Sequence, residues 1–109
     1  MIALLQMPAR SRMNPVLTEI RAHERSLSKH YRDGIERLDS AVRENWPSII
    51  ELAKKAGVSD EEMLRELGSS PSTIYRWISG DSAPREGTRR LMKRALLELL
   101  DDKLSTFEP

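Results

Sequence analysis

The sequence predicts an all-α protein: a domain of four to five helices with an extra long helix at its N-terminal side. Apolar residues recur three or four positions apart, which is the spacing of one face of an α-helix, and no segment alternates in the way of a β-strand. Residues that favour helix starts and glycines that favour helix ends separate these periodic segments. At 109 residues, the chain fits one domain with an appended helix.

Composition narrows the classes of function. Cysteine is absent, which excludes disulfides and thiolate chemistry and is compatible with a cytoplasmic protein. No apolar run approaches the roughly 18 residues of a membrane helix, and the N-terminus lacks a signal-peptide pattern, so we expect a soluble protein with no membrane partner. The net charge is only +1, but residues 68–94 carry six Arg or Lys against two acids, whereas residues 95–109 carry one base against four acids.

The N-terminal third predicts a tail and one long helix. Residues 1–13 have no periodicity, so we expect a flexible tail. Asn14 and Pro15 suit a helix start, and an apolar row predicts an amphipathic helix to about Arg43, with Gly34 as its weak point. This row consists of Leu17, Ile20, Leu27, Tyr31, Leu38 and Val42.

The apolar row is longer than a small domain can cover, so residues 14–46 are predicted to mediate oligomerisation. The cheapest partner is the same helix of a second copy in a homodimer. The alternatives are a helix that folds back on its own domain at Gly34, and a dimer contact through residues 96–100.

Residues 47–104 are expected to form the main domain, followed by a short tail at 105–109. Trp46 and Pro47 punctuate the chain, and Pro47 suits the first turn of a helix that Gly57 ends. Ser59 and Glu62 have the spacing of a capping box at the start of the next helix, which stops at Gly68.

The segment GSSPSTIYRWISGDSAP, residues 68–84, predicts a short helix from Pro71 to about Ser79. Ser70 can cap this helix, and Gly80 ends it. The residues spaced to face the core are Ile74, Trp77 and Ile78. Those left to solvent are Ser72, Thr73, Tyr75 and Arg76.

A last helix follows Pro84. Its apolar side consists of Leu91, Met92, Ala95, Leu96 and Leu99. Its charged side carries Arg85, Arg89, Lys93, Arg90 and Arg94. A charged outer face is ordinary for such a helix, so solvated arginines are the alternative to a nucleic-acid contact here.

Two short helices joined by about three residues with a glycine, the second polar on its outer face, are what a helix-turn-helix requires. The stretch VSDEEMLRELGSSPSTIYRWISGDSAP resembles the helix-turn-helix of the lambda-repressor/Cro (XRE-type) regulators. Their pattern of a helix ending in Leu-Gly, small residues, Thr-Ile-x-Arg-Trp and a trailing Gly and Pro is matched here by Leu67, Gly68, Ser69, Ser70, Thr73, Ile74, Arg76, Trp77, Gly80 and Pro84.

The resemblance covers about residues 47 to 100 and implies a lambda-repressor-like domain with residues 71–79 as recognition helix. Leu64 departs from it, because the family usually has a small alanine there. Asp60 also departs, because the family often has glutamine at this place near the DNA backbone.

Carried over position by position, the resemblance implies base contacts by Ser72, Tyr75 and Arg76. Arg76 suits a bidentate contact to guanine, while Tyr75 can pack on a thymine methyl or bond a phosphate. Without the motif, a solvated arginine is the simpler reading of Arg76. The candidate contacts to the DNA backbone are Ser70, Thr73, Ser79, Arg85 and Arg89.

We therefore expect a DNA-binding transcriptional regulator that binds double-stranded DNA as a homodimer. The resemblance to the lambda-repressor/Cro family favours a repressor, although the residues do not distinguish repressor from activator. The alternative is a protein-interaction module, such as an antitoxin or antiactivator, whose long N-terminal helix binds a protein partner.

Neither a cofactor nor catalysis is expected. His23 and His30 lie seven residues apart with no third ligand type nearby, so no metal site is predicted. No nucleophile and base set, phosphate-binding glycine loop or carboxylate pair is visible, so we expect no enzyme.

Overall fold

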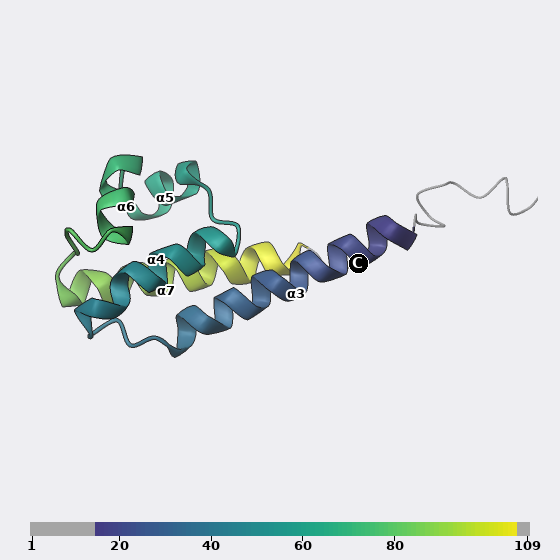
Figure 1. The fold of residues 1–109 in the computed structure, drawn as a ribbon, viewed down its shortest axis with the longest axis horizontal. Coiled ribbons are helices and arrows are strands. Elements are labelled where there is room, and N and C mark those ends of the chain that lie inside the picture. Colours follow the sequence, from purple (N-terminus) through teal and green to yellow (C-terminus); the bar gives the residue numbers. More distant parts are fainter. Residues whose placement is uncertain (1–14, 107–109) are drawn as a thin grey trace, which may run out of the picture.

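The structure is a computed structural model that describes residues 15–106. These residues form five α-helices and one 3-10 turn with no strand among them, which confirms the all-α prediction (Figure 1). The elements are α3 (Pro15–Arg37), η1 (Arg43–Asn45), α4 (Trp46–Lys55), α5 (Asp60–Leu67), α6 (Pro71–Ile78) and α7 (Glu86–Ser105). The predicted tail at 1–13, the predicted cap Asn14 and residues 107–109 lie outside the described part.

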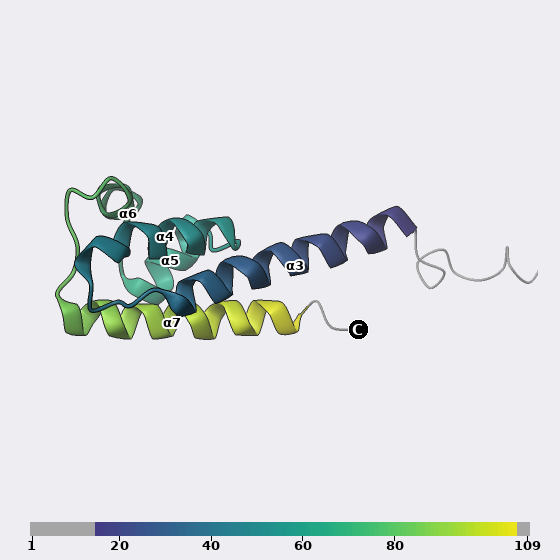
Figure 2. The same ribbon diagram turned by 60° about the horizontal axis from the view of Figure 1, so that its bottom comes forward.

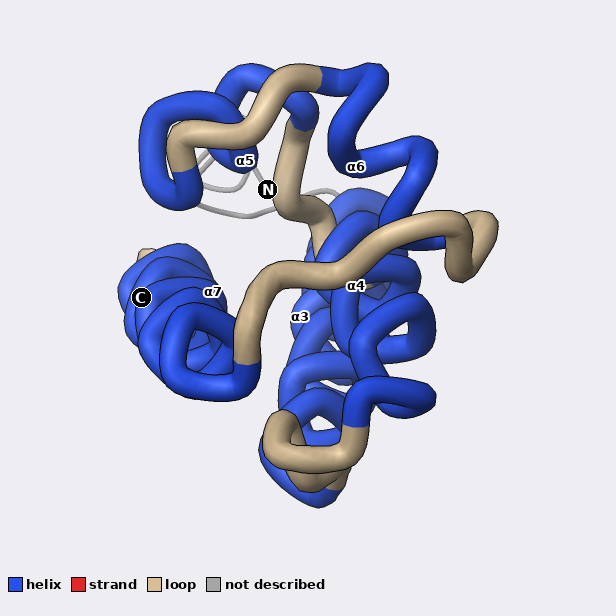
Figure 3. The backbone as a smooth tube through the Cα atoms, turned by 90° about the vertical axis from the view of Figure 1, so that its left-hand side faces the viewer, coloured by secondary structure: helices blue, strands red, loops and turns tan. Residues whose placement is uncertain are grey.

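Helix α4 is the centre of the core. It contacts α3, α6 and α7, and Figure 3 shows it flanked by α6 on one side and by α3 on the other. Its side chains Ile49, Ile50 and Ala53 are fully buried, and Leu96 and Leu100 of α7 complete the same core. These spacings of three and four residues are what an inward-facing helical stripe requires.

Trp46 belongs to this core, which corrects its interpretation as only a boundary residue between two helices. It is the first residue of α4 and is fully buried. Its ring packs edge-to-face on Trp77 of α6, with ring centroids 5.5 Å apart and an interplanar angle of 71°. The spacing of Trp46 to Ile49, Ile50 and Ala53 continues the buried stripe of α4 by one turn. Pro47 lies in the first turn, as predicted.

Helix α3 ends at Arg37, not near Arg43. The chain turns at Asp39, whose carboxylate accepts a hydrogen bond from the Ala41 amide at 2.9 Å. The Asn45 side chain also donates to the Asp39 carbonyl at 3.0 Å. Such local bonds from Asp and Asn side chains compete with helix formation.

The end of α3 and its turn are also fastened by α7. Lys93 Nζ donates to the carbonyls of Leu38 at 2.6 Å and Glu36 at 3.1 Å, which are acceptors that the end of a helix leaves unpaired. A cation at this end also interacts favourably with the helix dipole. Residues 38–42 are therefore a braced turn and not a continuation of the helix.

Gly34 does not interrupt α3. A side chain at this position would place its Cβ 3.3 Å from Leu52 Cδ1 of α4. The glycine therefore allows α3 and α4 to approach closely, and the helix runs straight through it (Figure 2).

The predicted helix ends around α5 are confirmed. The Ser59 hydroxyl accepts from the Glu62 amide at 3.1 Å, and the Glu62 carboxylate accepts from the Ser59 amide at 2.9 Å, which is a complete capping box. Gly68 ends α5 with φ +67°, a left-handed conformation that other residues rarely adopt. These two ends fix where the chain leaves α5 and approaches α6.

Glu62 has a second partner on α7. Lys103 Nζ lies 2.7 and 2.8 Å from its two carboxylate oxygens and 3.0 Å from the Gly57 carbonyl. The Lys103 bond, followed by the Ser59 amide, holds the pKa of Glu62 below its usual value. The depressed pKa means that the folded protein binds this proton less readily than the unfolded chain, so Glu62 stabilises the fold above the unfolded pKa of about 4.3.

We expect Glu62→Gln to lower the free energy of unfolding by about 1 kcal/mol at pH 7, because a glutamine retains the cap but loses the charge-assisted bond to Lys103. The deficit should shrink as pH falls below about 4.3, where the native carboxylate loses its advantage. Urea denaturation of both proteins at pH 7 and pH 3 measures the difference. A deficit that is equal at both pH values would contradict the assigned role of the charge.

Candidate nucleic-acid interface

Helix α6 is a short helix with one anchored side. Ser70 caps it by accepting from the Thr73 amide at 3.4 Å, and Pro71 occupies its first turn. Ile74 and Trp77 are buried against α4, as predicted, and Trp77 is 5% exposed. Gly80 follows the helix with φ +84°, which turns the chain away. The helix is thus held rigidly by its apolar side.

The opposite side of α6 displays the side chains that were predicted to read bases. Ser72, Tyr75 and Arg76 are all exposed, and Tyr75 is 70% exposed. Neither the Tyr75 hydroxyl nor the Arg76 guanidinium has a hydrogen-bond partner among residues 15–106. Both groups are therefore available to an outside ligand.

The hydroxyl groups at the start of α6 bond to one another. Ser70 Oγ lies 3.2 Å from both Ser72 Oγ and Thr73 Oγ1. When Ser70 donates its proton to Thr73, the Thr73 hydroxyl still has its own proton for an outside acceptor. Ser79 differs, because its hydroxyl donates to the Arg76 carbonyl at 3.1 Å and can offer only its lone pairs. To donate to a DNA phosphate, as predicted, the Ser79 hydroxyl would have to give up this bond.

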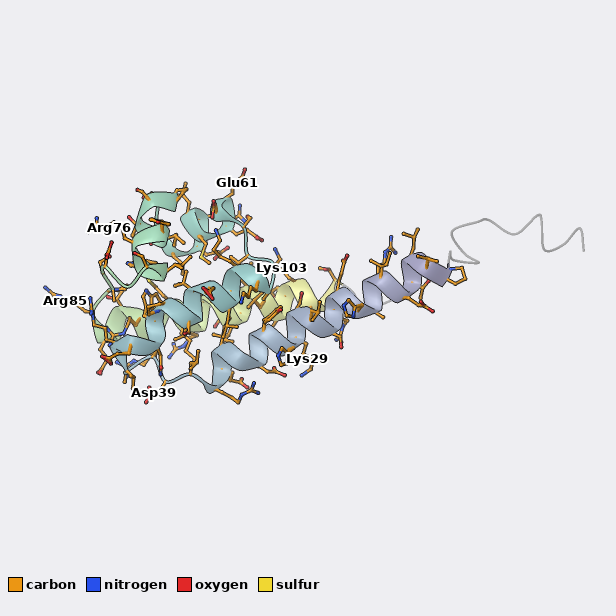
Figure 4. All side chains as sticks on the ribbon, viewed as in Figure 1. Lys29, Asp39, Glu61, Arg76, Arg85 and Lys103 are labelled. Atoms are coloured by element: carbon orange, nitrogen blue, oxygen red, sulfur yellow. The ribbon has the colours of Figure 1, made fainter. Side chains whose placement is uncertain are left out.

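Arg85 and Arg76 lie on the same end of the molecule, and both side chains extend outward (Figure 4). Arg85 is exposed at the N-cap of α7 and makes no side-chain cap bond. The structure therefore brings Arg85 to the same end as the exposed side of α6, as a phosphate contact there requires.

Arg89 is wrongly assigned to the DNA backbone. Its side chain points inward, the residue is 6% exposed, and its three nitrogens donate to three carbonyls. Nε bonds Ser40 O at 2.8 Å, Nη1 bonds Pro84 O at 2.6 Å, and Nη2 bonds Ala41 O at 3.1 Å. The guanidinium thus uses all three of its nitrogens to hold the turn after α3 and the loop before α7.

Two residues depart from the helix-turn-helix pattern that the sequence resembles, Leu64 and Asp60, and the surroundings of each accommodate the difference. Leu64 is half-exposed on α5, while Met63 and Leu67 are the buried residues of that helix. Asp60 is paired with Lys54 Nζ at 2.6 Å, which offsets its charge. Neither residue stands in the core between the helices.

The predicted oligomerisation row divides into two parts. Leu17, Ile20 and Leu27 are exposed on α3. The N-terminal half of this helix extends past the other helices (Figures 1 and 2). Tyr31 and Leu38 are instead partly buried against the core. Leu38 and Val42 lie beyond the end of α3, so the row of six predicted residues is not one continuous helical stripe.

Three further features of residues 15–106 concern other kinds of site. His, Asp and Glu do not gather anywhere between residues 15 and 106 in a group that can hold a metal ion. No helix in this range is long and apolar enough to cross a membrane. A cavity of about 500 Å³ lies between α3 and the C-terminal ends of α4 and α7, away from α6.

Trp46 is the residue of this site that the sequence analysis missed, because it supports α6 through Trp77. Its signal was the spacing to Ile49, Ile50 and Ala53. No protein-family model, curated protein or solved structure matches the chain.

Proposed function

We propose that this chain is a transcriptional regulator that binds double-stranded DNA sequence-specifically, with α5 and α6 as a helix-turn-helix of the lambda-repressor/Cro (XRE) type. The observation that carries the proposal is the two-sided character of α6. Its apolar side is locked by Trp77 against Trp46, while Ser72, Tyr75 and Arg76 are exposed on the other side. A helix that enters the major groove needs such a rigid support and such outward donors and acceptors.

The proposed regulator acts as a homodimer. One recognition helix of eight residues reads a short site, whereas two related by a two-fold axis read half-sites about 34 Å apart and add their contacts. The projecting half of α3 is the proposed assembly element. Repression is the proposed outcome, by analogy with the regulators that the motif resembles.

We expect Arg76→Ala to weaken binding to a specific operator by about 1 to 3 kcal/mol, because it removes a bidentate contact to guanine. Preference at one base pair of each half-site should relax, while binding to random DNA should barely change. Fluorescence anisotropy with DNA from upstream of the protein's own gene, beside a shuffled duplex, measures both quantities.

Arg94→Ala is the matched control, because it removes the same charge from an exposed position on α7. We expect a small and equal loss on both duplexes for the control. Equal losses for Arg76→Ala on specific and random DNA would make Arg76 a phosphate contact. Absence of any binding to the upstream region would argue against the regulator itself.

The projecting apolar half of α3 also supports a second candidate, a protein-interaction module such as an antitoxin or antiactivator. In that case α3 binds a different protein, and α5 and α6 serve autoregulation or packing. Co-purification with the product of a neighbouring gene, together with no shift of upstream DNA, would support this candidate over the first.

A further inference from the structure

The cavity beside α3 is a groove where the helices diverge. Its apolar walls are Leu27 and Tyr31 of α3, Ala56 at the end of α4, and Leu100 and Leu104 of α7. The charged residues Glu24, Lys55 and Lys103 also line it. Figure 2 shows α3 leaving the other helices at an angle here and continuing past the end of α7.

The groove continues directly into the exposed stripe of α3. Leu17, Ile20, Leu27 and Tyr31 are spaced three, seven and four residues apart, so they lie along one side of the helix. Val16 flanks this side, and the exposed fractions of the four aliphatic residues range from 39 to 61%. Ile35 is the one buried residue of α3, so the projecting half has apolar residues that its own domain does not cover.

We propose that the projecting half of α3 from a second copy of this chain occupies the groove, and that the first copy returns the same contact. This proposal specifies the contact that forms the homodimer. It rests on the proposed function only in that the function requires two copies of the chain. An antiparallel pair of α3 helices, with the two-fold axis between Ile20 and Glu24, places Leu17 of each copy opposite Leu27 of the other.

Charge and symmetry both favour a second copy as the occupant. In this register, Glu24 inside the stripe of each copy comes close to Arg21, which flanks the stripe of the other copy, so opposite charges meet across the axis. Because the two-fold axis makes each copy return the contact, the exposed stripe and the groove of both copies are covered at the same time.

The mass in solution tests the proposal without DNA, so its failure is separate from a failure of DNA binding. We expect light scattering to give twice the chain mass of 12.5 kDa for the wild type. Ile20→Glu should halve that mass with unchanged circular dichroism, since Ile20 supports no core residue. Leu91→Glu, the same change at an exposed position of α7, should remain dimeric. A monomeric wild type, or a dimeric Ile20→Glu, would overturn the proposal.

Disulfide trapping tests the register, because the chain has no cysteine of its own. Positions 17 and 27 lie about 15 Å apart along one helix, so neither can reach its own counterpart across the proposed axis. We expect mild oxidation to cross-link a mixture of Leu17→Cys and Leu27→Cys, and neither variant alone. Cross-linking of either variant with itself would refute the antiparallel register.

The apolar N-terminal sequence MIALLQM is the competing occupant of the groove. A monomer whose Leu27→Cys thiol reacts with a thiol reagent only after residues 1–13 are removed would assign the groove to that segment and overturn the proposal. A truncated protein that remains a dimer and still cross-links positions 17 and 27 would support it.

Discussion

Trp77→Ala is expected to lower the free energy of unfolding by about 3 to 5 kcal/mol, because it removes a buried aromatic ring and leaves a cavity. The lost edge-to-face contact with Trp46 contributes to this figure. Small domains are stable by about 5 to 15 kcal/mol in total, so the variant should be only marginally folded at 37 °C. Thermal melting followed by circular dichroism measures the effect.

Tyr75→Ala is the matched control, since it removes a neighbouring aromatic ring that is mostly exposed. We expect its stability to stay within about 0.5 kcal/mol of the wild type. Loss of DNA binding should follow unfolding in Trp77→Ala but occur in a fully folded Tyr75→Ala. An unchanged melting temperature for Trp77→Ala would show that α6 is not anchored by this ring.

The sequence was sufficient wherever structure depends on nearby residues. The capping box of Ser59 and Glu62 and the cap at Ser70 act within three residues, so their spacing alone identified them. The same is true of Gly68, whose left-handed conformation ends α5. The two sides of α6 also followed from helical spacing, because Trp77 and Tyr75 lie two positions apart and must point differently.

The sequence was insufficient to predict features of the structure that depend on contacts between residues far apart in the chain. Helix α3 was predicted to reach Arg43, and it stops at Arg37 in a turn held by Lys93 and Arg89, about 50 residues further along the chain. Leu91 was predicted to face the core, but it is exposed, because the neighbours of α7 cover a different part of its surface. No local pattern contains this information.

One part of the prediction for the row Arg85, Arg89 and Lys93 was right and another was wrong. The spacing of four residues correctly places them along one side of α7. The sequence assigned that side to solvent or phosphate, yet Arg89 and Lys93 meet the carbonyls of the turn after α3, and only Arg85 extends outward. A long cationic side chain can serve either purpose, and the position of the acceptor decides.

We expect Arg89→Ala to lower the free energy of unfolding by about 3 kcal/mol. The variant leaves the carbonyls of Ser40, Ala41 and Pro84 without their charged donor, and hydrogen bonds to charged groups are worth about 1.5 to 3 kcal/mol each before water replaces the exposed ones. Arg90→Ala removes an exposed arginine one position away and should change stability by less than about 0.5 kcal/mol. Urea denaturation of the three proteins measures both values.

Arg89→Lys separates the internal role from a phosphate contact. A lysine is a point charge, so it preserves much of a phosphate contact, but one ammonium cannot replace three nitrogens in a planar fork that reach three separate carbonyls. We therefore expect Arg89→Lys to be nearly as unstable as Arg89→Ala. The salt dependence of DNA binding by folded Arg89→Ala should keep the wild-type slope, because a lost phosphate contact would lower it by about 0.9. A stable Arg89→Lys combined with a lower slope for Arg89→Ala would return this residue to the DNA backbone.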